Sequence, residues 1–135
     1  MSGVPVPAQD PLRARREMEL HIAAAGVSRA CSLGLDAVCR VREQLMATTP
    51  VPGQTFQVVS DLIRNFGNAM VQCTTVAFYL DLARTHLGSM VEVMIADPDA
   101  DVHDEYGIAS GTVEALTQQH HQLQASIVHA CRLRL

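Results

Sequence analysis

Histidine and cysteine side chains near the end of the chain are the first candidates for chemistry. His120 and His121 are adjacent, and Cys131 follows in the same segment. Imidazole nitrogens and thiolates are ligands that zinc prefers, so these three residues could serve a metal- or ligand-binding helical bundle. Adjacent residues on a helix point about 100° apart, and one ion would not be chelated well by the pair. No metal site is therefore predicted, and the metal-binding bundle is kept as a second alternative.

Acidic side chains suggest a different ion. Three aspartates match ligand positions one, three and five of a calcium-binding EF-hand loop: Asp97, Asp99 and Asp101. Val102 stands where that loop requires glycine, and Ile108 stands where it requires glutamate. Calcium binding is therefore not predicted. We expect residues 96–107 to form an acidic linker.

Catalytic and nucleic-acid-binding patterns are also missing from the sequence. His103, Asp104 and Glu105 are consecutive, but no nucleophile stands at a recognisable spacing from them. All ten cationic residues are arginine. The sequence also has 14 acidic residues, so the net charge is −4. Nucleic-acid binders usually carry a basic surplus that neutralises phosphates. We therefore predict no catalytic residues, no cofactor, no enzymatic activity and no direct contact with nucleic acid.

The four cysteines are predicted to be reduced packing residues. Cys31 and Cys39 are eight residues apart, about 12 Å along a helix, which is too far for a disulfide. The N-terminus has no apolar segment typical of a signal peptide, and no continuous apolar run reaches the ~20 residues of a membrane span. We expect a protein that is neither secreted nor embedded in a membrane.

Helical periodicity dominates the rest of the sequence. Apolar and small residues repeat at alternating steps of four and three, a period of 3.5 that is typical of coiled-coil packing. The fold is predicted to be all-α, with three long helices over about 10–47, 55–95 and 110–134 in a helical bundle. They form one domain, residues 10–135, after a disordered tail, residues 1–9.

The first and third segments have regular seams. The first contains Leu20, Ala24, Val27, Cys31, Gly34, Val38, Val41 and Leu45. The third contains Val113, Leu116, His120, Leu123, Ile127 and Ala130. Glycine on a seam lets another chain segment approach, so a close contact is expected at Gly34. A polar residue on a seam, such as His120, sets the register or faces a partner.

The second segment is predicted to contain the partner-binding surface. Its seam consists of Phe56, Val59, Ile63, Phe66, Met70, Cys73, Ala77, Leu80, Leu87, Val91 and Met94. Arg84 interrupts this seam, and it is expected either to extend its charged end into solvent or to pair with an acid on another helix or another chain. Past Gly88, where the helix is expected to bend or end, four apolar residues would be left uncovered: Met90, Val91, Met94 and Ile95. The alternative is a self-contained three-helix bundle that buries them. The predicted partner-binding residues are Arg84, Met90, Val91, Met94, Ile95 and His120.

Two stretches resemble a known family. Residues 31–38, Cys-Ser-Leu-Gly-Leu-Asp-Ala-Val, resemble the first helix of subunit thirty of the Mediator transcription coactivator, and residues 116–123 are similar to that family's glutamine-rich final helix. The order of long helix, Pro-Gly turn, helix, acidic loop and final helix is also similar. The resemblance implies a nuclear, non-enzymatic subunit of the Mediator head region. Such a subunit packs against other Mediator subunits and helps to bridge activators to RNA polymerase II.

The expected function follows from the seams and this resemblance. We expect a helical scaffold or interaction subunit of a larger assembly, bound to other protein subunits through helix–helix packing. It could also self-associate when isolated. The alternative is a small bacterial or viral chaperone or adaptor that holds a partner helix in an apolar groove. The expected location is the nucleus if the Mediator resemblance holds, and the cytoplasm otherwise.

Overall fold

The structure is a computed structural model that describes residues 11–46, 56–99 and 102–134. The predicted disordered tail and the proline-rich turn after the first helix lie outside these residues. The described chain consists of three helices that pack against one another and contains no strand. The predicted all-α bundle is therefore confirmed.

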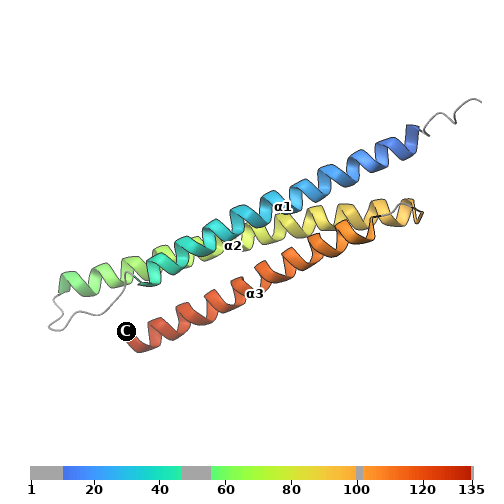
Figure 1. Cartoon of the computed structure of the whole chain (residues 1–135). Helices are drawn as coiled ribbons and strands as arrows, with labels where there is room; N and C mark the ends of the chain where they lie inside the picture. The colour runs from blue at the N-terminus through green and yellow to red at the C-terminus, as the bar shows by residue number, and fades with distance from the viewer. Residues whose placement is uncertain (1–10, 47–55, 100–101, 135) are drawn as a thin grey trace, which may run out of the picture.

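The three helices are α1 (Pro11–Met46), α2 (Phe56–Ala96) and α3 (His103–Arg134). Helices α1 and α2 run antiparallel, side by side, and α3 returns beneath them (Figure 1). Most interhelical contacts join α1 to α2, while α3 contacts both. Helix α1 begins with proline, which suits the first helical position because its missing N–H would have no partner there.

The predicted end of the second helix near residue 95 agrees with α2, whereas the predicted start of the third helix is wrong. Helix α2 neither ends at Gly88 nor stops short of Ala96, because buried residues on the following turns, Met90 and Val93, attach it to the bundle. Helix α3 begins at residue 103 rather than near 110, so the predicted acidic linker is shorter than expected.

The early start of α3 has two physical causes. Asp104 and Glu105 lie in its first turn, where carboxylates interact favourably with the positive end of the helix dipole. The same alternating spacing also extends the seam back through Ala109 and Tyr106 to Val102, whose carbonyl accepts a 2.9 Å hydrogen bond from the Tyr106 N–H. The acidic composition concealed this continuation of the apolar pattern.

Small residues form the centre of the α1–α2 interface. Side chains no larger than valine recur every seven residues on both helices and are fully or almost fully buried: Ala23, Ala30 and Ala37 of α1, and Ala69, Val76 and Ala83 of α2. Small side chains at the contact let the two backbones approach closely. The predicted α1 seam is confirmed, since its eight residues are buried or half-buried, and these alanines widen it.

Glycines on α1 accept side chains from the other helices. A Cβ atom at Gly34 would lie 2.7 Å from Cδ2 of Leu116 and 3.4 Å from Cβ of Tyr79, so the close contact expected there is confirmed. A Cβ at Gly26 would lie 2.6 Å from Nδ1 of His86. A Cβ at either position would therefore displace the neighbouring side chain.

The predicted seam of α2 is half correct. Phe66, Cys73 and Leu80 are buried as expected. The intervening positions are shifted by one residue: Leu62 and Ala69 are buried, whereas Ile63 and Met70 are exposed. The buried intervening residues are Leu62, Ala69, Val76, Ala83 and Met90. The buried residue is the smaller neighbour at Ala69 but the larger one at Val76 and Met90, so side-chain size alone does not select it.

Replacing Val38 by Asp should destabilise the fold by several kcal/mol, about 3 or more, because the change buries an unpaired charge. Val38 is 1% exposed and lies in the core. Denaturant melts would measure the change, with Leu35→Asp, at a neighbouring exposed position of α1, as the control. An equal effect of the two substitutions would contradict this account of the core.

Two glycine substitutions should have opposite effects. Gly88→Ala should raise the free energy of unfolding by about 0.5–1 kcal/mol, because a Cβ there meets open space and alanine favours a helix. Gly34→Ala should lower it, because overpacking against the buried Leu116 costs about 1–3 kcal/mol. Thermal melts of both variants would show whether the signs differ.

Candidate functional site

The predicted stripe near the end of α2 is not an uncovered surface. Met90 is 0% exposed and belongs to the hydrophobic core, and Val91 and Met94 are half-buried. Only Ile95 is freely exposed, at 73%. The prediction that all four lie uncovered is therefore wrong, because α2 remains packed against the bundle up to its last turn. Whether Ile95 contacts a partner stays a prediction.

Arg84 and His120 lie at the α2–α3 contact. Arg84 is exposed, and its Nη2 donates a 3.3 Å hydrogen bond to Oγ1 of Thr117, while Nη1 lies 3.8 Å from Oδ1 of Asp81. The Thr117 hydroxyl in turn donates a 2.8 Å bond to the Val113 carbonyl. Arg84 therefore joins α2 to α3 within the chain. Arg84 interrupted the predicted seam because the residue that is buried at this turn of α2 is its neighbour, Ala83.

His120 is half-buried, and its environment opposes protonation. Burial lowers the pKa of His120, the neighbouring His121 and Arg84 lower it further, and Asp81 raises it. His120 also lines a groove of about 370 Å³ between α2 and α3. The other lining residues are Met70, Cys73, Thr74 and Ala77 of α2, and Gln124, Ile127 and Val128 of α3.

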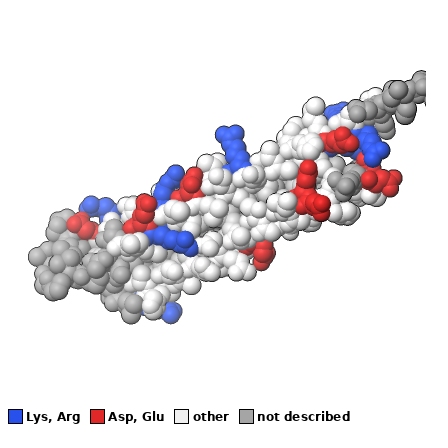
Figure 2. All heavy atoms as spheres, in the orientation of Figure 1, with Lys and Arg blue, Asp and Glu red and all other residues white. Residues whose placement is uncertain are grey.

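Sequence reasoning missed this groove, although the charge pattern could have indicated it. No Asp, Glu, Lys or Arg occurs within residues 65–80 of α2 or 115–131 of α3. These two segments face each other across the groove, so its lining has no formal charge. Charged side chains are also sparse over the middle of the visible face and gather toward the two ends of the molecule (Figure 2).

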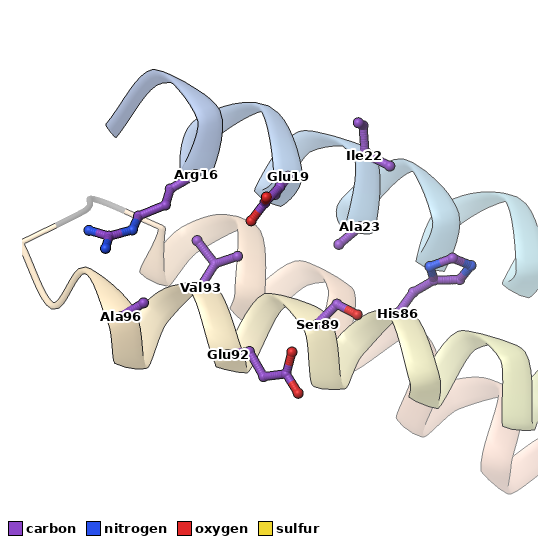
Figure 3. A pocket seen from close by; sticks show the side chains of 9 residues that line it. All are labelled: Arg16, Glu19, Ile22, Ala23, His86, Ser89, Glu92, Val93 and Ala96. Atoms are coloured by element: carbon purple, nitrogen blue, oxygen red, sulfur yellow. The ribbon is translucent and has the colours of Figure 1, made fainter. Parts of the chain in front are cut away.

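A second groove, of about 470 Å³, lies between the start of α1 and the end of α2. The side chain of His86 points from α2 toward α1, and the side chain of Glu19 points from α1 toward Val93 (Figure 3). Arg16 and Glu92 also line it. The lining combines both signs of charge with apolar side chains, which is typical of a solvated crevice between helices and defines no single ligand.

The described helices give little evidence of a metal site or of a reactive cysteine. The described residues contain no group of three or more His, Cys, Asp and Glu side chains that could hold a metal ion. The four cysteines are free thiols. Burial raises the pKa of Cys31 and of Cys73, which fits the predicted packing role. Cys39 is exposed, so the prediction that it packs in the core is wrong.

Helix α1 meets a simple criterion for a membrane-crossing helix. It contains an 18-residue window with a mean hydropathy of 1.3, of which 39% is buried inside the bundle. It is the one helix in the described part of the chain that is long and apolar enough, by length and composition only. Core helices of soluble proteins satisfy the same criterion.

Comparisons with known proteins identify no relative. No protein-family model, no curated protein and no solved structure matches this chain.

Acid should destabilise the fold through His120. Because its pKa is lowered in the folded state, the unfolded chain takes up a proton first, and stability falls as the pH drops below about 6.5. His120→Asn should lose less stability than the wild type between about pH 7 and pH 5. Urea unfolding at several pH values would test this, and equal losses would contradict it.

Proposed function

We propose that this chain is a non-enzymatic interaction subunit that holds a helix of another protein in the α2–α3 groove. The observation that carries the proposal is the uncharged lining of this groove. An amphipathic helix can lay its apolar face into such a surface and keep its charged face in water. The helices of the chain supply the rigid walls.

The lining residues suit this form of recognition. Cys73 and Ile127 are buried and supply an apolar floor, while Met70 and Val128 are exposed at its rim. Gln124 is exposed in the lining and can exchange hydrogen bonds with polar groups of the partner.

The assembly to which such a subunit would belong is a further part of the proposal. The resemblance of residues 31–38 and 116–123 to subunit thirty of Mediator favours a role in RNA polymerase II transcription, with a nuclear location. Both stretches lie at helix contacts, since Gly34 accepts Leu116. The partner helix would then come from another Mediator subunit.

Affinity purification of the tagged full-length chain, followed by mass spectrometry, would test this function. We expect a defined set of partner proteins, which Val128→Glu abolishes because it places a charge at the rim of the groove. Gln122→Glu is the matched control, because Gln122 is exposed on α3 outside the groove lining.

The two variants separate the possible outcomes. Loss of the partners with Val128→Glu alone supports the groove, and other Mediator subunits among them would support that assignment. Retention of every partner by Val128→Glu would contradict the groove as the binding site. Circular dichroism of both variants would show that the helices remain folded.

A further inference from the structure

One side chain in the α2–α3 groove can change its charge near neutral pH. Of the eight residues that line the groove, His120 and Cys73 are the two that titrate, and the others have apolar, hydroxyl or amide side chains. Burial raises the pKa of the Cys73 thiol, so this thiol stays neutral in acid. Histidine is the side chain whose ordinary pKa, about 6.5, lies in the physiological range. His120 is therefore the lining residue that can place a charge in the groove.

His120 lies against the apolar part of the groove. It is half-buried on α3. Gln124 and Ile127, one and two turns further along α3, also line the groove, and Ile127 is buried. From α2, Cys73 and Ala77 complete this part of the lining. An imidazolium at this place would carry its charge beside apolar side chains rather than in open solvent.

The charged and titratable groups around His120 come from all three helices. Burial lowers the pKa of His120 most, His121 of α3 and Arg84 of α2 lower it further, and Asp81 of α2 raises it. The imidazole centroids of His120 and His121 are 6.2 Å apart. On the α1 side, Arg42 donates a hydrogen bond to the residue that precedes His120. Asp81 is the one anion among these groups, and it also lies 3.8 Å from Nη1 of Arg84.

We propose that protonation of His120 releases the partner helix from the α2–α3 groove, so that the groove holds its partner at neutral pH and loses it in mild acid. This inference rests on the proposed function, because it concerns the regulation of the same groove. A partner helix that lays its apolar face on the groove removes water from His120. Since the loss of water disfavours the charged form of histidine, the partner and the proton compete.

The sign of this effect depends on what the partner places over His120. A carboxylate there would pair with the imidazolium and reverse the effect of acid. The cation at this end of the groove, Arg84, already lies near Asp81 and donates a hydrogen bond to Oγ1 of Thr117. Arg84 therefore has an anion nearby without any contribution from the partner. An apolar residue of the partner over His120 also fits the uncharged lining.

A synthetic helical peptide would serve as the partner in the test. It would have about 18 residues, or five helical turns, with leucine along one face, glutamine and lysine on the other, and capped ends. Such a peptide does not titrate between about pH 5 and pH 8. Fluorescence anisotropy of the labelled peptide would measure its Kd for the full-length chain. From about pH 7.5 to pH 5.0 we expect Kd to rise about threefold or more, and by less than tenfold per pH unit, because one proton is linked to binding.

Three variants would identify the responsible group. His120→Gln should remove the change of Kd with pH. His121→Gln is the matched control, because this adjacent histidine is exposed and lies outside the groove lining, and it should keep the change. Val128→Glu should weaken binding at both pH values, as expected for a residue at the rim of the groove. Circular dichroism would compare the helicity of each form at the two pH values.

A nuclear magnetic resonance titration would measure the same linkage from the side of the proton. The imidazole signals of His120 are those that His120→Gln removes. Because partner and proton must affect each other equally, the bound peptide should lower the pKa of His120 further. This measurement stays close to neutral pH, so it remains decisive if the chain loses helicity in acid. A peptide that leaves this pKa unchanged, or raises it, would overturn the inference.

Failure of the inference would differ from failure of the proposed function. If the peptide binds the wild type at neutral pH, is lost from Val128→Glu and keeps the same Kd in acid, the groove is supported and release through His120 is overturned. Tighter binding in acid, or a full pH response in His120→Gln, would also overturn it. A peptide that does not bind at neutral pH, or that binds Val128→Glu as tightly as the wild type, would contradict the groove itself.

Discussion

The close packing of α1 against α2 is the constraint on which the rest of the structure depends. Alanines and a valine at seven-residue spacing are buried on the two helices, and glycines on α1 accept His86 and Leu116. Small side chains bring the backbones together but bury little apolar surface each. The larger buried side chains must therefore lie beside these small residues on α1 and α2, or on α3, which supplies Leu116, Leu123 and Ile127.

This constraint also fixes which side of α2 remains exposed. Because Ala69, Val76 and Ala83 of α2 are turned into the core, the side chains of Met70, Val71 and Phe78 are rotated away from it. A soluble monomer rarely exposes apolar side chains in one contiguous area without a function for it. The exposed surface of α2 is thus a consequence of how the core is packed.

Polar contacts have a secondary role in placing α3. Arg84 bonds to Thr117 on the α2 side, and Arg42 donates to Oε1 of Gln119 on the α1 side. His21 Nδ1 lies 3.8 Å from Glu105 Oε1 near the start of α3. Exposed contacts of this kind contribute little stability each, so the rotation of α3 depends mainly on its buried residues, Leu116, Leu123 and Ile127. That rotation places His120 and Ile127 in the groove.

The sequence by itself determined the all-α class, the three helices, the seam of α1 and the close contact at Gly34, because heptad spacing and glycine are local signals. Only the tertiary structure decided the rotation of α2, the burial of Met90, the start of α3 at residue 103 and the groove between α2 and α3. A period of 3.5 defines a helix face only to within about one residue. The choice between adjacent residues, such as Ala69 and Met70, depends on how closely the neighbouring helix packs, and that distance is a property of the assembled bundle.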